Sequence, residues 1–216
     1  MPIGRNTLLT IAAATATLVA AAIVAHRVTQ FYSAPDAGIH VNELGISDWR
    51  RFSHSGARQG AAQPVVTIVE FSDFTCPACR SSAGIFRTIV RRHPHDVAFV
   101  YRHFPLNDLA RTAAVSAECA RRAGRFAQMH DVLFEMADSI GQKPWADFAR
   151  AAGIKALPAF DGCMQDSTAL MSVWSDTHTG DSLFIKETPT FLVNDRLFVG
   201  VPDSVGFDRY INDLIR

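Results

Sequence analysis

The sequence predicts an α/β protein in which a βαβ unit and a ββα unit are separated by an inserted all-helical segment. Three observations support this prediction. An apolar run at 65–71 leads into a helical pattern and then into a second apolar run at 97–101. An alanine-rich stretch with helical spacing occupies about 107–181, and two short strand-like runs follow Pro189. A strand, a helix and a strand at this spacing indicate a right-handed parallel crossover.

The composition is that of one globular domain preceded by an N-terminal extension. The chain has 216 residues, of which 48% are hydrophobic and 10% are aromatic. This content suits a sizeable core and argues against a disordered chain. Because 21 basic residues balance 21 acidic ones, the charge gives no support for nucleic-acid binding or for a general attraction to acidic surfaces.

Residues 8–25 form an uncharged run rich in Ala, Leu, Val and Ile, with Arg5 before it and Arg27 after it. This pattern predicts export of the domain to the periplasm or another extracytoplasmic face. As a helix the run would be about 27 Å long, just enough for the hydrocarbon core of a membrane. Small alanines near its end suit a signal peptidase. We therefore expect residues 1–26 to be either an inner-membrane anchor or a cleaved signal peptide.

Residues 27–62 contain four glycines and little periodicity, which predicts a linker with one short helix at 46–52. We expect the domain itself to occupy 63–216. It begins with the strand at 65–71, which is apolar except for one threonine and one acidic residue.

The remaining elements follow from periodicity and from turn residues. Apolar residues at near-helical spacing predict a helix at about 76–92, and the run at 97–101 predicts the second strand of the parallel unit. Glycines and prolines divide 107–181 into several short helices, whose Met and Phe residues we expect in the core. A hairpin is expected at 189–199, and a last helix at about 203–214.

The motif Cys76-Pro77-Ala78-Cys79 lies where the first strand gives way to a helix. The positive end of a helix stabilises a thiolate, and Pro77 is favoured in the first helical turn. Two intervening residues let Cys79 turn back toward Cys76 and form a disulfide. The motif therefore predicts a redox-active pair that needs no metal and no organic cofactor. Half of a zinc site is the alternative, but the second Cys or His pair that such a site needs is not evident.

Cys119 and Cys163 remain if Cys76 pairs with Cys79. In an oxidising compartment they can form a stable disulfide. As two separate buried thiols they would pack like small hydrophobic side chains. The residues alone leave both interpretations open.

Three motifs, in order along the chain, resemble the DsbA-like family of exported thiol-disulfide oxidoreductases. They are the stretches 70–79 (EFSDFTCPAC), 101–106 (YRHFPL) and 188–194 (TPTFLVN). The resemblance covers about 63–216 and implies a thioredoxin-like fold with an inserted all-helical subdomain.

The same resemblance implies roles for the residues of the motifs. Cys76 would be the exposed attacking sulfur and Cys79 the more buried resolving one. Pro189 would be cis and lie against the cysteine pair, although a trans-proline at a strand start is the alternative. Thr188 would then offer backbone hydrogen bonds to an extended substrate segment, beside Pro77 and Ala78.

Glu70 lies six residues before Cys76, where the family carries a buried acid that helps to move the proton of the resolving thiol. An acid in an apolar strand is costly unless it has such a task or a hydrogen-bond partner, so a structural acceptor is the alternative. The resemblance also implies that Cys119 and Cys163 form a structural disulfide.

These features predict an exported enzyme that oxidises dithiols of cysteine-containing proteins to disulfides through Cys76 and Cys79, and that a membrane redox partner reoxidises. Ala78 replaces the histidine of the family's best-known oxidase, so a disulfide reductase or isomerase that uses the same cysteines stays open. A chaperone that binds unfolded peptides and uses its cysteines only structurally is a third hypothesis.

Overall fold

The computed structural model describes residue 22 and residues 45–216. Of the predicted export segment 8–25, only Ala22 is therefore described, and most of the predicted linker also falls outside the described residues. In the described part of the chain, no helix is long and apolar enough to cross a membrane.

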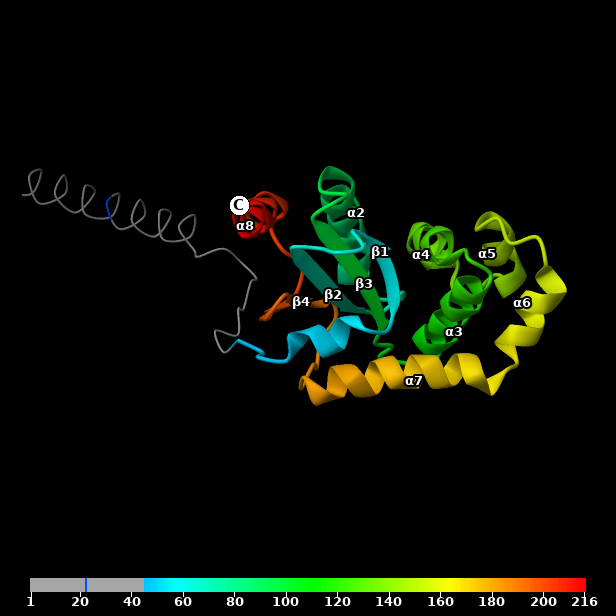
Figure 1. Cartoon of the computed structure of the whole chain (residues 1–216). Helices are drawn as coiled ribbons and strands as arrows, with labels where there is room; N and C mark the ends of the chain where they lie inside the picture. The colour runs from blue at the N-terminus through cyan, green and yellow to red at the C-terminus, as the bar shows by residue number, and fades with distance from the viewer. Residues whose placement is uncertain (1–21, 23–44) are drawn as a thin grey trace, which may run out of the picture. The chain divides into compact units, whose positions relative to one another are not determined.

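A five-stranded mixed sheet in the order β1-β3-β2-β4-β5 forms the centre of the domain (Figure 1). Its strands are β1 (Ala57–Gly60), β2 (Val66–Ser72), β3 (Val97–His103), β4 (Thr190–Val193) and β5 (Arg196–Val199). β2 and β3 run parallel, and the other three pairs are antiparallel. The two predicted units are thus joined in one sheet, with β2 at its centre.

Seven α-helices and two short 3-10 helices complete the described chain. The crossover helix α2 (Pro77–Arg92) links β2 to β3, and α8 (Ser204–Ile215) follows β5. The insertion consists of α3 (Asp108–Arg122), α4 (Phe126–Glu135), η2 (Ala137–Ser139), α5 (Trp145–Ala151), α6 (Leu157–Met164) and α7 (Ser167–Ser182). In Figure 1, α2 and α8 lie above the sheet, α3 to α6 form a group beside it, and α7 runs beneath.

Apolar side chains cover both faces of the sheet. The face toward α2 and α8 carries Ile68 and Phe191, which belong to the larger core together with the apolar residues of the insertion. The opposite face carries Val69 and Phe71, which form a smaller core with Phe52. Because β2 is buried on both faces, its apolar residues do not alternate strictly with polar ones, and its polar residues Thr67, Glu70 and Ser72 are buried as well.

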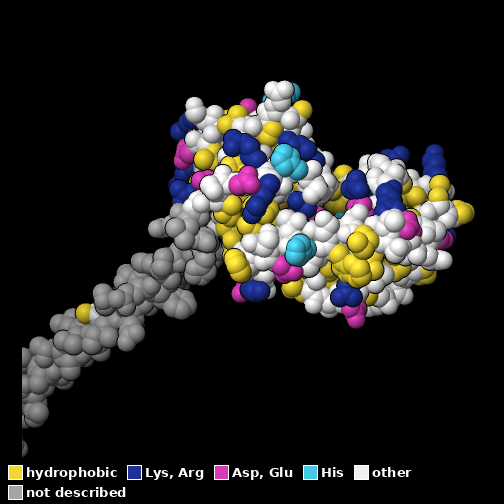
Figure 2. All heavy atoms as spheres, turned by 60° about the horizontal axis from the view of Figure 1, so that its bottom comes forward, with side chains coloured by type: hydrophobic (Ala, Val, Ile, Leu, Met, Phe, Trp, Pro, Cys, Tyr) yellow, Lys and Arg dark blue, Asp and Glu magenta, His cyan; other side chains and the backbone are white. Residues whose placement is uncertain are grey.

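The outer surface carries charges of both signs. Figure 2 shows the side that lies at the bottom of Figure 1, where basic and acidic side chains alternate with apolar patches. Met171 and Trp174 on α7 are among the exposed apolar residues. This mixed surface agrees with the balanced charge of the sequence.

The predicted fold is confirmed, with a correction at the N-terminal boundary. β1 (Ala57–Gly60) pairs with β3, although we expected a linker as far as residue 62. The short helix expected at 46–52 is the 3-10 helix η1 (Trp49–Ser53). An edge strand buries few side chains, and Ala57 alone is buried in β1, so no apolar run marks this strand in the sequence.

Candidate active site

Cys76 lies at the junction between β2 and α2. It is the residue before the first helical turn, with φ −83° and ψ 120°, and Pro77 begins the helix. No side chain caps this end of α2. The sulfur therefore lies at the positive end of the helix, beside backbone N–H groups that the helix leaves without partners.

The two cysteines of the motif differ in exposure. Cys76 is partly exposed, whereas Cys79 is fully buried, and both are free thiols in this structure. Burial raises the pKa of the Cys79 thiol far above its usual range, and the nearby Glu70 raises it further. A reagent from solution can therefore reach Cys76, while Cys79 is disfavoured as an anion. Between them, Pro77 is exposed and Ala78 is half-buried.

The segment before β4 lies directly against the motif. The peptide bond between Thr188 and Pro189 is cis. The Cys76 thiol donates a hydrogen bond to the Thr188 carbonyl oxygen at 3.3 Å. Pro189 is buried and Thr188 is partly exposed. The structure thus brings together residues that are 112 positions apart in the sequence.

Asp73 fixes the turn before Cys76, and the sequence analysis missed it. Its carbonyl oxygen accepts from the Cys76 N–H at 3.1 Å. Its Oδ1 accepts from the N–H and hydroxyl of Thr75 at 2.6 and 2.8 Å, and its Oδ2 accepts from the Leu106 N–H at 2.9 Å. The carboxylate therefore joins this turn to the loop after β3. An Asp two residues before a Thr is a local turn signal that could have identified it.

Glu70 is fully buried at the centre of β2. Its Oε1 accepts from the Ser82 hydroxyl at 3.3 Å, and its Oε2 has no hydrogen-bond partner among the described residues. Burial raises its pKa to about 8, and the hydroxyls of Ser72 and Ser82 only partly oppose this shift. At neutral pH the carboxyl group therefore holds its proton, close to the buried Cys79.

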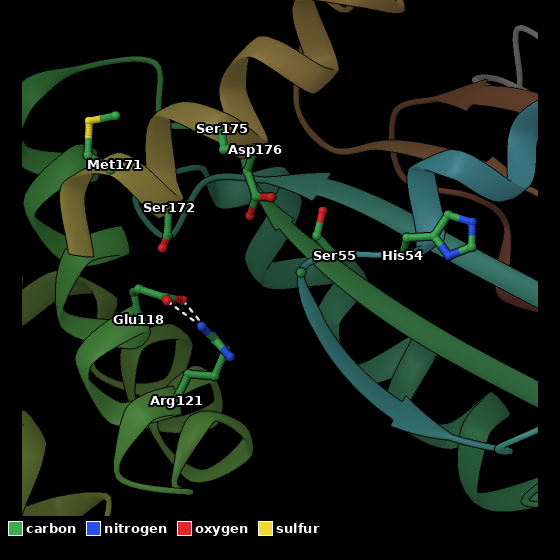
Figure 3. Close-up of a pocket in the computed structure, with 9 residues that line it drawn as sticks. His54, Ser55, Glu118, Arg121, Met171, Ser172, Ser175 and Asp176 are labelled. Carbon is green, nitrogen blue, oxygen red and sulfur yellow. Dashed lines mark hydrogen bonds and ion pairs between the residues drawn. The ribbon is translucent and has the colours of Figure 1, made fainter. Parts of the chain in front are cut away.

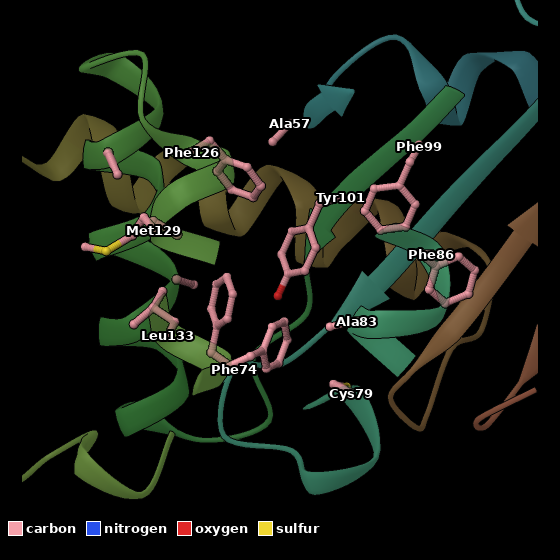
Figure 4. Close-up of a cluster of buried hydrophobic side chains, with 14 of the residues drawn as sticks. Ala57, Phe74, Cys79, Ala83, Phe86, Phe99, Tyr101, Phe126, Met129 and Leu133 are labelled. Carbon is pink, nitrogen blue, oxygen red and sulfur yellow. The ribbon is translucent and has the colours of Figure 1, made fainter. Parts of the chain in front are cut away.

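Tyr101 and Phe74 close the site on the side of β3. Tyr101 is the register partner of Glu70 and is fully buried. Its ring stacks on Phe74, with 5.1 Å between the ring centroids and 17° between the planes. Figure 4 shows both rings between β3, the start of α2 and the insertion. The loop that carries Cys76 is thus packed against the insertion through the Phe74 ring.

Cys119 and Cys163 are joined by a disulfide that links α3 to α6. Their Cα atoms are 5.7 Å apart. The bond lies within the insertion and includes neither cysteine of the motif at α2.

A separate cavity of about 520 Å³ lies between α3, α7 and the loop before β1 (Figure 3). Its lining charges are already paired. Arg121 contacts Glu118 at 2.6 Å, and Asp176 contacts Arg102 at 2.5 Å. The cavity contains no cysteine, and its paired charges leave no evident binding chemistry. In the described part of the chain, no cluster of three or more His, Cys, Asp or Glu residues is placed to hold a metal ion.

Comparison with known sequences gives one family and several much longer relatives. A family model described as Thioredoxin matches residues 53–213. The Na(+)/H(+) antiporter NhaA 3 of Salinispora tropica is 31% identical over 64% of this chain and 21% of its own length. The Na(+)/H(+) antiporter NhaA 1 of Mycolicibacterium gilvum is 31% identical over 70% of this chain and 25% of its own length. The chain thus spans about a fifth to a quarter of these relatives, whose names describe far longer proteins.

Solved structures share the fold. A periplasmic thioredoxin-like protein from Salmonella enterica serovar Typhimurium has a TM-score of 0.66 and 20% identity, over 80% of this chain and 99% of that one. The alpha-DsbA1 of Wolbachia pipientis has a TM-score of 0.62 and 20% identity, over 73% and 89%. A thioredoxin-like oxidoreductase from Silicibacter pomeroyi has a TM-score of 0.62 and 24% identity, over 73% and 90%.

Proposed function

Because this chain belongs to the thioredoxin family of thiol-disulfide oxidoreductases, we propose that it is an exported oxidase that introduces disulfides into other proteins through Cys76 and Cys79. The predicted relationship to DsbA-like proteins is confirmed by the family model and by the shared fold. The direction of electron transfer, the location and the roles of individual residues are parts of the proposal.

One observation carries the proposal, namely the different surroundings of the two sulfurs. Cys76 is accessible at the start of α2 and is hydrogen-bonded to the Thr188 carbonyl oxygen. Cys79 is fully buried, near an acid that holds a proton at neutral pH. This difference allows an external thiolate to attack the Cys76 sulfur while the Cys79 sulfur leaves.

The reaction begins with the Cys76–Cys79 disulfide. A substrate thiolate attacks Cys76, a mixed disulfide forms, and Cys79 leaves with the electron pair of the broken bond and then takes up a proton. A second substrate thiolate attacks the substrate sulfur of the mixed disulfide and releases Cys76. The substrate gains a disulfide, and the enzyme is left with two thiols. A membrane redox partner that accepts two electrons then reoxidises the pair.

The segment before β4 would hold the substrate. Thr188 precedes the buried cis-proline Pro189 and is the residue whose carbonyl already accepts a hydrogen bond from Cys76. An extended substrate strand can pair with backbone groups at this position. Pro77 and Ala78, on the first turn of α2, would contact the same substrate beside the reacting sulfur.

A reductase or isomerase is the second candidate, and Ala78 is the observation that favours it. A methyl side chain provides neither charge nor a hydrogen bond to a thiolate at Cys76, and a strong oxidant depends on stabilising its reduced form. The same residues would then act in reverse, with Cys76 attacking a substrate disulfide and Cys79 releasing the mixed disulfide.

The test is the reduction potential of the pair, measured on the full chain in glutathione buffers and read by alkylation of free thiols. A value near about −120 mV would support disulfide donation, whereas a value near about −270 mV would identify a reductase. The same protein is then assayed for oxidation of a reduced, unfolded substrate protein. Cys76→Ser should abolish this oxidation, and a double Cys119→Ala/Cys163→Ala variant should retain it.

Comparison of the Cys76→Ser variant with the parent protein also tests the chaperone hypothesis. A chaperone would keep its suppression of aggregation when Cys76 is replaced, and it would show no thiol turnover before the replacement. Thiol turnover that depends on Cys76 would contradict that hypothesis.

Export is supported by the run at 8–25 and by the Cys119–Cys163 disulfide, because stable disulfides belong to oxidising compartments. A similar fold occurs in a protein described as periplasmic. Fractionation of cells that express the full chain tests this part. Recovery of the protein in the cytoplasm, with Cys119 and Cys163 reduced, would contradict export. The mass of the recovered protein then distinguishes a cleaved signal peptide from a membrane anchor.

A further inference from the structure

Ser72, the last residue of β2, lies among the polar groups beneath the active site. Its side chain lies on the same face of the strand as that of Glu70, because side chains two residues apart share a face. Helix α2 covers this face with Cys79 and Ser82, and all four residues are at most 1% exposed. A buried hydroxyl in such a place needs a partner, since an unpartnered polar group is costly.

Three groups that can lose a proton lie on the same side of the sheet as Ser72, namely Glu70, its register partner Tyr101, and Cys79 on α2. Burial raises the pKa of Glu70, of Cys79 and of Tyr101, and the Ser72 hydroxyl partly opposes each rise because it can stabilise the anionic form. In the present geometry the Ser72 hydroxyl, Glu70 Oε2 and the Tyr101 hydroxyl have no hydrogen-bond partner among the described residues. These three buried atoms lie on one face of the sheet, and none of them is engaged in another hydrogen bond among the described residues.

The Tyr101 ring is held in place by its neighbours. Phe74 stacks on one face, and the His130 ring lies edge-on with 5.2 Å between the centroids. In Figure 4 the hydroxyl of Tyr101 points into the space between Phe74 and Ala83. These two ring contacts fix the direction of the hydroxyl on the face of the sheet that α2 covers.

We propose that the Ser72 hydroxyl relays a proton between Glu70 and Cys79, and that the Tyr101 hydroxyl is a positioning group that orients Ser72. The inference rests on the proposed function, in which Cys79 leaves as an anion when the Cys76–Cys79 bond breaks. Cys79 keeps the electron pair of that bond. Ser72 gives its hydroxyl proton to Cys79 and takes the proton of the Glu70 carboxyl group. Ser72 is then unchanged, Cys79 is a neutral thiol and Glu70 is a carboxylate.

Several elements contribute titratable groups around this cluster. They are Cys79 on α2, Tyr101 and His103 on β3, His130 on α4 and Asp73 in the loop after β2. Opposite Glu70, β4 contributes the apolar Phe191. Burial lowers the pKa of His103, so this imidazole is neutral near pH 8. A titration near pH 8 therefore reports on Glu70, whose pKa is about 8.

The test is the titration of the Glu70 carboxyl group in the reduced full chain, followed by infrared spectroscopy of its protonated carbonyl band. Glu70→Gln assigns the band. In Ser72→Ala the midpoint should rise, because a group that stabilises the carboxylate is lost. The loss of one hydrogen bond predicts a threefold to tenfold increase in proton affinity, as an order of magnitude. Tyr101→Phe should raise the midpoint less, since Tyr101 acts through Ser72.

The double variant Ser72→Ala/Tyr101→Phe separates a relay from two independent contacts. We expect its midpoint to equal that of Ser72→Ala, because Tyr101 has nothing to orient once Ser72 is gone. Ser116→Ala is the matched control, since it removes another fully buried hydroxyl, on α3, and should leave the midpoint unchanged. A midpoint that does not move in Ser72→Ala, or full additivity in the double variant, would overturn the proposal.

The rate of disulfide reduction by a small dithiol gives a second measurement. Ser72→Ala should slow this step by on the order of tenfold or more, because general acid catalysis is impaired. An unchanged rate would also overturn the relay. Failure of the proposed function would look different. In that case Cys76→Ser would still oxidise the substrate, while the titration midpoint of Glu70 would still shift in Ser72→Ala.

Discussion

Glu70 places a carboxyl group in an apolar strand, and its burial decides both its charge and its effect on stability. Its pKa is raised from 4.5 to about 8. Between these values the folded chain keeps a proton that the unfolded chain has lost. The free energy of unfolding therefore falls as the pH rises from about 4.5 to about 8. Above about pH 8 it does not fall further on account of Glu70.

Glu70→Gln removes this dependence, because glutamine stays neutral. We expect the variant to be more stable than the parent at pH 7 by on the order of 3 kcal/mol, with no gain at pH 4. It should also exchange thiols more slowly. Urea unfolding of the reduced proteins at both pH values measures the difference. Asp138→Asn is the control, since that carboxylate is 91% exposed, and a gain at pH 4 as large as that at pH 7 would contradict the explanation.

Asp73 acts on the active site through geometry. Asp73→Ala leaves the Thr75 and Leu106 N–H groups without their acceptor, which should lower the free energy of unfolding by about 1 to 3 kcal/mol. The reaction of Cys76 with a small disulfide should slow as well, because the turn before it loosens. Asp73→Asn keeps one acceptor oxygen, so its free energy of unfolding and its reaction rate should lie between those of the parent protein and those of Asp73→Ala. If Asp73→Ala is destabilised but its Cys76 still reacts at the rate of the parent protein, the turn does not position the sulfur.

At the scale of elements, the Cys119–Cys163 disulfide joins α3 to α6 across a separation of 44 residues. Its loss frees this loop in the unfolded chain, so Cys119→Ala/Cys163→Ala should be less stable by about 2 to 5 kcal/mol. The reduction potential of the Cys76–Cys79 pair should stay the same. Thermal unfolding and glutathione equilibration measure the two quantities separately. A changed potential at unchanged stability would mean that the bond acts on the motif instead of on the fold.

Most elements could be predicted because their signals are local. The apolar run of β2, the helical spacing of α2 and the proline before β4 lie within the segments that they define. β1 could not be predicted, since it depends on pairing with β3. The proposed roles of Ser72 and Tyr101 were missed for the same reason. Each role depends on neighbours that are distant in the sequence, namely Cys79 on α2 for Ser72 and Glu70 on β2 for Tyr101.

At the scale of the whole molecule, Arg102 and Asp176 connect three parts of the chain. The pair is 2.5 Å apart, with side chains 2% and 8% exposed. Arg102 also donates to the Phe52 carbonyl oxygen, at 3.1 Å from Nε and 2.9 Å from Nη2. The second carboxylate oxygen of Asp176 accepts from the His103 N–H at 3.1 Å. One buried ion pair thus joins η1, β3 and α7.

Asp176→Asn leaves the buried guanidinium without its counter-charge. The free energy of unfolding should fall by about 3 to 5 kcal/mol, because an unpaired buried charge is strongly unfavourable. Asp147→Asn is the control, since its pair with Arg150 is exposed and should be worth less than about 1 kcal/mol. Denaturant titration compares the two variants. Equal effects would mean that the Arg102 side chain finds another partner or reaches water.

The contact between His103 and Asp176 also bears on how this architecture tolerates change. His103 is the last residue before the insertion leaves the sheet, and Asp176 belongs to the helix that returns toward β4. The two ends of the insertion are therefore bonded to each other at its base. Helices α3 to α6 lie between these two ends, so a change of length within them does not by itself break the hydrogen bond that joins β3 to α7. An exchanged insertion must still supply an apolar contact to Phe74, because this ring packs the loop that carries Cys76 against Phe134 of α4.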